Sequence, residues 1–364
     1  MRQAKSLELQ KKGTDLTLLT VVLILVVFGA VMVYDTSSVQ GLKDFKDSYY
    51  YIRQQLVWVG VGLVSMIFFA RFDYKKFKVY SLPLILFSFL LLVAVFIPTL
   101  GVSGGGAHRW LKIGPLTIQP AEIIKLTGVI FLSAVFEKKA RALPFLILVG
   151  GVTIITAVLQ KDLGSTFVFV LTASLLYFAS GAPYWQILLT LPLGLVALAT
   201  LIFTSGYRSK RILAFLDPFS DPQGFTYHIS QVLIALGSGG LFGLGLGHSR
   251  QKFEYIPQVS TDSIFAIIGE ELGLVGSIFL LSLFALLVVR GFKIAERCGD
   301  NFGKILALGL TCWLGIQVII NLSSMTALLP LTGVPLPFIS YGGSALVANL
   351  TAVGILLNIS KQTA

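Results

Sequence analysis

The sequence predicts an all-α polytopic integral membrane protein with about ten transmembrane helices. Of its 364 residues, 55% are hydrophobic and only 12% are charged, whereas an ordinary soluble domain carries about 25% charged residues. The mean hydropathy of +0.85 points to the same class. Apolar runs of about 20 residues, long enough to cross a bilayer, recur along the whole chain. We therefore treat residues 1–364 as a single membrane domain.

Two of the apolar runs are too long for one crossing. The uncharged run from Leu163 to Tyr207 is divided at Gly181 and Pro183, because Pro lacks an N–H and Gly permits a turn. The uncharged run from Ile305 to Ser360 is divided in the same way by its Pro and Gly residues. The predicted transmembrane spans are 15–35, 52–70, 79–99, 120–136, 142–160, 163–180, 184–204, 262–290, 304–328 and 341–360.

The distribution of Lys and Arg predicts which side of the membrane each loop faces. Short loops on the cytoplasmic side of a membrane protein carry an excess of these residues. The excess falls on the loops that share a side with the N-terminus, which begins with a basic stretch. With ten spans, both termini are then cytoplasmic.

The large loop between spans 7 and 8, residues 205–261, is predicted to be extracytoplasmic. It contains an apolar stretch, residues 229–247, whose second half is rich in glycine. Glycine is poor material for a lipid-facing helix. We expect a helix followed by a re-entrant or membrane-surface turn that other parts of the protein shield from lipid.

Asp262 opens the eighth span on the outer side. One interpretation is a carboxylate that stabilises the helix dipole, and composition alone favours it. The other is a general base at the mouth of an outward cavity. The helix N-terminus is expected to lower the pKa of this carboxyl and to keep it ionised at neutral pH.

Other charges lie inside predicted spans. Glu122 and Lys125 share one face of the fourth span, and a charge at bilayer depth is costly, so such ions usually pair. They form either a structural pair or part of a functional pathway. Glu270 and Glu271 are expected to pack against other helices or Gly-rich backbone, with a proton relay as the weaker alternative.

Basic residues also gather on the outer side, against the usual trend. An anionic ligand is the simplest explanation, since the guanidinium fork of Arg suits phosphate, although any one of them could be a solvated loop residue. The loop from Pro330 to Gly343 is either a cap or a shaped wall beside a cleft. The outer basic residues are Arg109, Lys112, Arg208, Lys210, Arg211, Arg250 and Lys252.

Three long motifs identify a resemblance. They are GAHRWLKIGPLTIQPAEIIKL from Gly106, ALGSGGLFGLGLGHSRQKFEYIPQVSTDSIFAIIGEELG from Ala235, and LLPLTGVPLPFISYGG from Leu328. With them the chain resembles, over essentially its whole length, the SEDS family of FtsW, RodA and SpoVE. The stretch from Ser249 to Tyr255 is closer to the FtsW and SpoVE branch. The chain departs from the family pattern at Lys161, where Pro is usual, and at Ser263, where Phe is usual.

The resemblance implies a peptidoglycan glycosyltransferase that polymerises lipid II into β-1,4 glycan strands with inversion at the donor sugar. It implies that Asp262 is the essential aspartate and the general base, which reverses the preference drawn from composition. Arg109, Arg208, Lys210 and Arg211 would bind the pyrophosphate, and Glu122 and Lys125 would form a supporting ion pair. Other positions that match the family pattern are Asp162, Gln231, Ser340, Tyr341 and Gly342.

The resemblance also implies a location and partners. The chain would lie in the bacterial cytoplasmic membrane with its active face outside. It would act on lipid II and undecaprenyl-pyrophosphate-linked glycan, beside a class B penicillin-binding protein and other divisome or elongasome membrane proteins, and not on nucleic acid. A divalent cation, Mg²⁺ or Mn²⁺, is associated with the family, but no dedicated metal site and no organic cofactor are expected. The competing hypotheses are a lipid II flippase and a non-catalytic scaffold.

Overall fold

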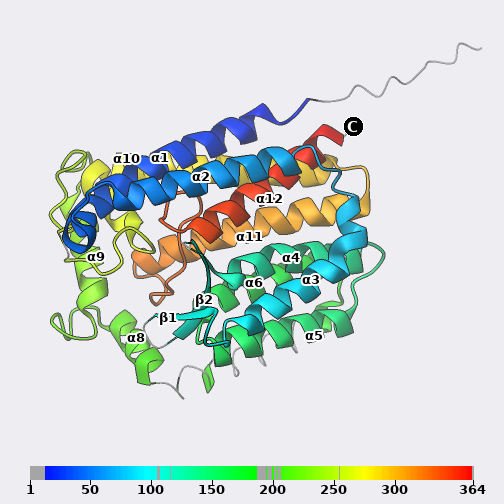
Figure 1. The fold of residues 1–364 in the computed structure, drawn as a ribbon, viewed down its shortest axis with the longest axis horizontal. Coiled ribbons are helices and arrows are strands. Elements are labelled where there is room, and N and C mark those ends of the chain that lie inside the picture. Colours follow the sequence, from blue (N-terminus) through cyan, green and yellow to red (C-terminus); the bar gives the residue numbers. More distant parts are fainter. Residues whose placement is uncertain are drawn as a thin grey trace, which may run out of the picture.

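The computed structural model describes residues 13–362, apart from 105–106, 115, 187–193, 195–198, 201–202, 204–205 and 254. Long helices lie side by side in one bundle (Figure 1). The helices are α1 (Leu16–Phe45), α2 (Tyr50–Phe69), α3 (Lys76–Ala94), α4 (Pro120–Phe136), α5 (Ala142–Thr153), the π-helix η1 (Ile154–Leu159), α6 (Leu163–Ala179), α8 (Gly206–Leu216), α9 (Tyr227–Ser238), α10 (Ile264–Arg297), α11 (Asn301–Met325) and α12 (Gly343–Gln362).

Seven helical segments in the described part of the chain are long and apolar enough to cross a membrane. α6 is a shorter apolar helix of the same kind, and α4 coincides with the predicted span 120–136. The predicted span 184–204 lies largely outside the described residues. The chain is therefore a multi-pass membrane protein. The seven segments are Leu16–Phe45, Tyr50–Phe69, Lys76–Ala94, Ala142–Leu159, Ile264–Arg297, Asn301–Met325 and Gly343–Gln362.

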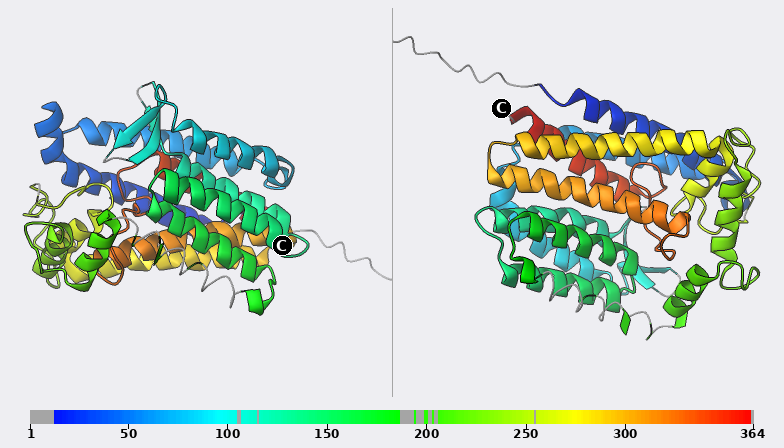
Figure 2. Two further views of the ribbon diagram at one scale, coloured as in Figure 1. Left: turned by 90° about the horizontal axis from the view of Figure 1, so that it is seen from below. Right: turned by 180° about the vertical axis from the view of Figure 1, so that it is seen from behind.

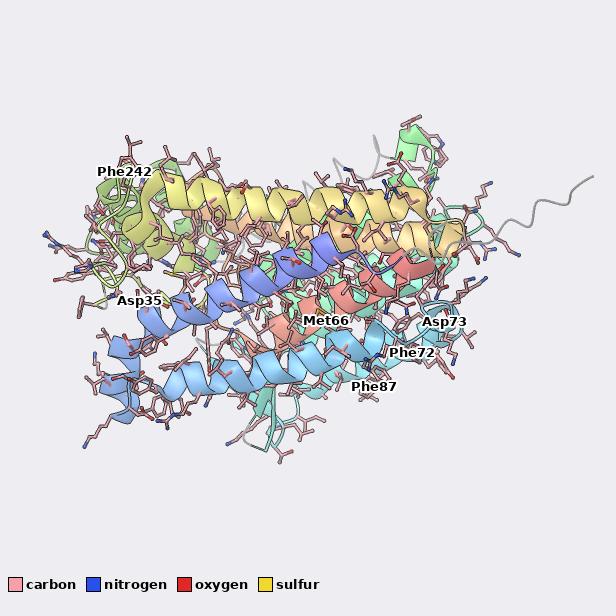
Figure 3. The ribbon with its side chains drawn as sticks, turned by 90° about the horizontal axis from the view of Figure 1, so that it is seen from above. Asp35, Met66, Phe72, Asp73, Phe87 and Phe242 are labelled. Carbon is pink, nitrogen blue, oxygen red and sulfur yellow. The ribbon has the colours of Figure 1, made fainter. Side chains whose placement is uncertain are left out.

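The outer faces of the bundle are apolar. Val79 on α3 is 76% exposed, and Val64 on α2 and Leu143 on α5 are each 69% exposed. Phe87 points away from the bundle in Figure 3. Surfaces of this kind are unfavourable in water but match the hydrocarbon of a bilayer. α12 and α11 are the inner helices, with α12 packed on α2, α4 and α11 (Figure 2).

Several helix boundaries differ from the predicted spans because a helix does not end where the apolar run ends. α1 continues to Phe45, well past the predicted end at residue 35, and stops only where Lys46 adopts a left-handed conformation with φ 56°. Aspartate side chains begin three helices by accepting a backbone N–H. Asp15 accepts from Leu18, Asp162 from Ser165, and Asp300 from Gly303.

The prediction of an entirely helical chain is wrong for one segment. Between α3 and α4 the chain forms a small antiparallel sheet in the order β1-β2-β3, which projects from the side of the bundle (Figure 2). The strands are too short, and too mixed with Gly and polar residues, to give an apolar run. They are β1 (Gly101–Gly104), β2 (Ala107–Ile113) and β3 (Leu116–Ile118).

The bundle has two distinct ends. We call one the terminal end, because the Asp15 backbone N–H donates to Ser360 Oγ at 3.2 Å, and Arg290 Nη2 pairs with Asp15 Oδ2 at 2.6 Å. The other, which holds α8, α9 and residues 239–262, we call the loop end. Figure 3 labels Asp35 and Phe242 at the loop end.

α10 is interrupted near the loop end. Gly273 has φ 64° and ψ −163°, so residues 264–272 form a short first section and the rest of α10 a long second section. The Gly-rich segment after α9 packs around this break, and its Leu244 and Gly245 N–H groups donate to the carbonyls of Glu270 and Glu271 at 3.0 Å each. α9 is a helix, as expected, and the Gly-rich segment follows it. A re-entrant or membrane-surface position for that segment stays a prediction.

Candidate active site

Buried charge is concentrated at the loop end. In the part of the chain that the structure describes, every charged residue that is buried as a whole lies in the early turns of α4 or α10, at the cap of α6, or in the segment between α9 and α10; the Asp15 side chain, at the terminal end, is also little exposed. Charges that are kept from water need partners or a function. The charged residues buried as a whole are Glu122, Lys125, Asp162, Lys252, Asp262, Glu270 and Glu271.

Asp262 lies two residues before α10 and is 5% exposed. The Thr261 hydroxyl donates to its Oδ1 at 3.1 Å. Asn321 of α11 donates from the same amide nitrogen to the Asp262 carbonyl and to the Val334 carbonyl, each at 2.8 Å. The backbone that carries Asp262 is thus fixed to α11 and to the loop that follows it.

The protonation of Asp262 differs from the sequence expectation. Burial raises the pKa of this carboxyl to about 6, although the Thr261 hydroxyl and the positive charge of Arg211 both lower it. The helix N-terminus was expected to lower this pKa. Burial outweighs that effect, because removal of the carboxylate from water penalises its charged form more strongly. A carboxylate with this pKa is a better base than an exposed one and is still mostly ionised at pH 7.

The loop from Pro330 to Gly343 forms a wall beside Asp262. Gly333 has φ +68°, and a Cβ added there would lie 3.6 Å from Asp262 Oδ2. The loop is held by the backbone N–H of Tyr341, which donates to the Ser260 carbonyl at 2.8 Å. The Ser340 hydroxyl accepts from the Leu336 N–H at 2.8 Å. Gly342 then leads directly into α12, so the three family-pattern positions shape this wall.

Arg109 and Arg208 converge on one turn. Arg109 on β2 donates to the carbonyls of Gln160 and Lys161, and Arg208 on α8 donates to the carbonyl of Ala157 at 2.8 Å. Burial and the neighbouring Arg109 charge both lower the pKa of Arg208. Two guanidinium groups so close together would be stabilised by an anion between or beside them.

Arg211 and Lys210 line a cavity of about 190 Å³ between α8, α9 and the loop after α11. Arg211 also donates to the Leu331 carbonyl at 2.8 Å. His228 of α9 faces the same cavity, and burial, together with Arg211, lowers its pKa to about 4. The remaining lining is mostly apolar: Ala214, Phe215, Phe225, Ile229, Leu329, Pro330 and Leu331.

Glu122 and Lys125 form the expected ion pair in α4. Lys125 Nζ lies 2.8 Å from Glu122 Oε1, and the side chains are 1% and 2% exposed. The ammonium also donates to Gln317 Oε1 at 2.9 Å and lies 5.6 Å from the centre of the Trp313 ring. The pair ties α4 to α11, which carries Asn321.

Asp162 and Gln231 have different surroundings. Asp162 is 6% exposed, begins α6 as its cap, and accepts from Gln119 Nε2 at 3.2 Å. This gives it a structural role at the turn that Arg109 contacts. Gln231 is half-buried on α9, one turn after His228.

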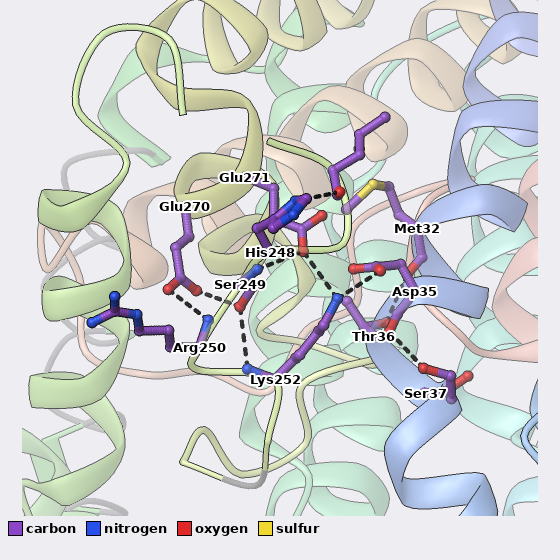
Figure 4. Close-up of polar contacts among 12 residues, drawn as sticks. Met32, Asp35, Thr36, Ser37, His248, Ser249, Arg250, Lys252, Glu270 and Glu271 are labelled. Carbon is purple, nitrogen blue, oxygen red and sulfur yellow. Dashed lines mark hydrogen bonds and ion pairs between the residues drawn. The ribbon is translucent and has the colours of Figure 1, made fainter. Parts of the chain in front are cut away.

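Lys252 departs from the expectation of a basic outer loop residue. It is 7% exposed, and its Nζ pairs with Asp35 Oδ1 at 2.8 Å and with Glu271 Oε1 at 3.2 Å (Figure 4). Lys112, Lys210 and Arg250 are exposed, as a ligand-facing or solvated residue would be.

Sequence reasoning missed several residues that fix the site. His228 Nε2 and Ser263 Oγ share a hydrogen bond of 2.8 Å directly beside Asp262, and Ser263 stands where the family usually has Phe. Asn321 and Asp35 were also overlooked. The available signal was a lone polar residue in or at the end of an apolar run, which in a membrane helix usually has a specific partner.

The side chains around Asp262 do not form a metal cage. In the described residues, no group of three or more His, Cys, Asp or Glu side chains comes together as metal ligands. A Mg²⁺ ion needs several oxygen ligands, and Asp262 alone does not supply them. Cys298 and Cys312 are free thiols.

Comparison with known proteins gives matches along the whole chain. The family profile of FtsW, RodA and SpoVE, described as a cell cycle protein, matches residues 15–364. A probable peptidoglycan glycosyltransferase FtsW of Geobacter sp. strain M18 is 38% identical over 362 residues, covering 96% of this chain and 98% of its own. Stage V sporulation protein E of Bacillus subtilis strain 168 is 39% identical, covering 97% and 99%.

Solved structures share the fold. One chain from a study of the structural coordination of polymerization and crosslinking by a peptidoglycan synthase complex has a TM-score of 0.78 and 28% identity, covering 95% of this chain and 97% of its own. The rod shape determining protein RodA of Thermus thermophilus has a TM-score of 0.71 and 28% identity, covering 96% and 97%.

Proposed function

The chain belongs to the family of FtsW, RodA and SpoVE, and on that premise we propose that it is a peptidoglycan glycosyltransferase. Its reaction would be the polymerisation of lipid II into β-1,4 glycan strands at the outer face of the cytoplasmic membrane. The Geobacter relative is named a probable peptidoglycan glycosyltransferase. This activity also fits the site. The substrate is a pyrophosphate on a lipid carrier, and such a substrate would reach a membrane protein from within the membrane.

One observation supports this proposal most directly. A buried carboxylate with a raised pKa, Asp262, lies at the same end of the bundle as Arg109, Arg208 and Arg211. A base and a group of cations are the two parts that transfer from a glycosyl pyrophosphate requires. Both are drawn from segments that are distant in the sequence.

The proposed chemistry follows from these two parts. Asp262 accepts the proton of the acceptor 4-hydroxyl as that oxygen attacks the anomeric carbon of the donor sugar. The bond from the anomeric carbon to the pyrophosphate oxygen breaks, and the pyrophosphate leaves with the electron pair. Arg109, Arg208, Lys210 and Arg211 stabilise the leaving charge. Attack from the face opposite the leaving group converts the α-linked donor into a β-linked product.

The apolar lining of the cavity near Arg211 suits such a substrate. Phe215 and Phe225 lie in the wall that also presents Lys210 and Arg211. A ligand with a phosphate head and a hydrocarbon chain needs both kinds of surface. An undecaprenyl-pyrophosphate carrier has this character.

We propose ten crossings, with both termini in the cytoplasm and the loop end outside. Asp15 and Ser360 are in contact, which requires an even number of crossings between them. α6 begins just after η1, and Arg208 of α8 donates to the Ala157 carbonyl of η1. The start of α6 and the start of α8 therefore lie at the same end of the bundle, which requires an even number of crossings between them. We assign one of these crossings to the predicted span 184–204.

The partner we propose is a class B penicillin-binding protein, within the divisome or elongasome. The chain itself resembles one chain of a peptidoglycan synthase complex that coordinates polymerization and crosslinking. Cross-linking of the new strand would come from that partner.

A flippase for lipid II is the weaker alternative. It is favoured by the buried ions Glu122 and Lys125, since ions inside a membrane protein often mark a transport pathway. However, these ions are paired with each other and with Gln317 near the start of α4. In the described residues, the buried charges other than the Asp15 side chain are gathered at the loop end and do not line a route across the bundle.

The test uses the purified full-length chain with its transpeptidase partner and lipid II, with glycan strands resolved on a gel. We expect polymer from the native chain and none from Asp262→Ala. Asp44→Ala, a change at an exposed aspartate of α1, is the matched control and should polymerise normally. Equal polymer from the native and Asp262→Ala proteins would exclude Asp262 as the base. Transfer of lipid II across vesicles without polymer would favour the flippase.

A further inference from the structure

A buried ion network joins three parts of the chain at the loop end (Figure 4). Lys252 lies in the segment between α9 and α10, and its Nζ bridges Asp35 of α1 at 2.8 Å and Glu271 of α10 at 3.2 Å. The exposed fractions of the Lys252 and Glu271 side chains are 6% and 0%. A buried ammonium between two carboxylates is held firmly, because any movement would leave charges unpaired in a poorly solvated site.

The two glutamates also bind the backbone of the segment that carries Lys252. Glu271 Oε1 accepts from the Ser249 N–H at 3.0 Å, and Glu270 Oε1 accepts from the Arg250 N–H at 3.0 Å. The Ser249 hydroxyl donates to Glu270 and accepts from the Lys252 N–H. Three of these four hydrogen bonds tie the segment to the first section of α10, and the fourth, from the Lys252 N–H, lies within the segment.

A break in the helix divides this first section of α10 from the rest. It covers residues 264–272 and ends at Gly273, whose φ of 64° breaks the helix. Asp262 lies just before its beginning, and Glu270 and Glu271 lie at its end. The section is therefore a short rod of about 13 Å with the base at one end and the ion network at the other.

The network connects the far end of this rod to α1 through ion pairs. Without it, the hydrogen bond from Asn321 to the Asp262 carbonyl would remain, but a rotation at Gly273 would change the direction of the rod. A tilt of about 5° over about 13 Å moves its other end by about 1 Å. A displacement of that size in a catalytic group can reduce the rate about 100-fold.

We propose that Lys252 is a positioning residue for the transfer reaction: by bridging Asp35 and Glu271 it fixes the first section of α10 and thereby the location of Asp262. This inference rests on the proposed role of Asp262 as the base. Lys252 does not contact the substrate, because its ammonium is enclosed by carboxylates from α1 and α10. The basic residues at the loop end therefore have two roles in this proposal: Arg109, Arg208, Lys210 and Arg211 bind the substrate pyrophosphate, and Lys252 holds parts of the protein together.

The test compares single and double variants in the polymerisation assay, with kcat and KM for lipid II measured separately. Lys252→Met and Asp35→Asn should each lower kcat by about 30- to 100-fold, with KM changed by less than about threefold. The double variant should be no slower than the slower single variant, because both changes break the same bridge. Lys252→Arg, which keeps the charge, should restore most of kcat.

Three controls keep the outcomes distinct. Lys139→Met removes an exposed lysine and should leave kcat unchanged. Melting temperature and elution volume in detergent show whether each variant is folded. If Lys252→Met does not fold, Asp35→Asn and Lys252→Arg carry the test.

Unchanged kcat in folded Lys252→Met or Asp35→Asn would overturn the proposal. So would a raised KM for Lys252→Met together with normal Asp35→Asn, since that pattern indicates direct substrate binding. Asp262→Ala in the same assay separates the two levels of inference. If Asp262→Ala is inactive and Lys252→Met is normal, only the positioning role fails; if Asp262→Ala is active, the proposed base fails.

Discussion

The raised pKa of Asp262 gives a prediction that can be worked through in numbers. A base must be ionised to accept a proton, so activity should fall as the pH falls through about 6. With that pKa, about nine-tenths of the carboxyl is ionised at pH 7 and about one-tenth at pH 5. The plateau rate should therefore drop about tenfold between pH 7 and pH 5.

Thr261→Val should shift the pH dependence of activity to higher pH. The Thr261 hydroxyl donates to Asp262 Oδ1 at 3.1 Å, a bond that favours the ionised carboxylate. A hydrogen bond contributes about 0.5–1.5 kcal/mol, and one pKa unit corresponds to about 1.4 kcal/mol. The pKa should rise by about 0.4–1 unit, in the lower part of that range because the hydroxyl is also 3.0 Å from the Gln258 carbonyl.

The assay is the rate of lipid II polymerisation between pH 4.5 and 8, with enzyme stability checked at each pH. We expect the acid limb of the Thr261→Val profile to move to higher pH. Thr153→Val, a change at a half-buried threonine of α5, should leave it in place. An inflection near pH 4 in the native protein, or no shift in Thr261→Val, would refute the argument that burial sets the basicity of Asp262.

Three further predictions concern the supports of the site. Lys125→Met should lower the unfolding free energy in detergent by about 3–5 kcal/mol, because Glu122 would remain buried without its partner; a loss below about 1 kcal/mol would contradict this. Asn321→Leu should cost about 1–3 kcal/mol and lower kcat, since it leaves two buried carbonyls without a donor; unchanged melting and rate would show that those bonds are dispensable. Gly333→Ala should cost about 1–2 kcal/mol for the left-handed backbone alone; a neutral melting temperature would show that the loop relaxes.

The membrane fold could be predicted in large part because the lipid environment imposes local rules. Apolar runs of sufficient length predict spans wherever they occur, and α4 has the bounds 120–136 that the sequence indicated. The small sheet β1–β3 escaped prediction because its strands are stabilised by pairing with one another and not by local composition. The extension of α1 to Phe45 escaped it because polar residues continue the helix beyond the apolar run.

The candidate site divides in the same way. The sequence by itself determined which residues carry charge inside apolar surroundings, and the spacing of Glu122 and Lys125 already put them on one helix face. Only the tertiary structure decided that Asp262 is buried enough to raise its pKa, that Gly333 lies beside it, and that Lys252 faces Asp35. Burial and contacts between distant segments depend on how the helices pack against one another. No local pattern in the sequence reveals which helices will be neighbours.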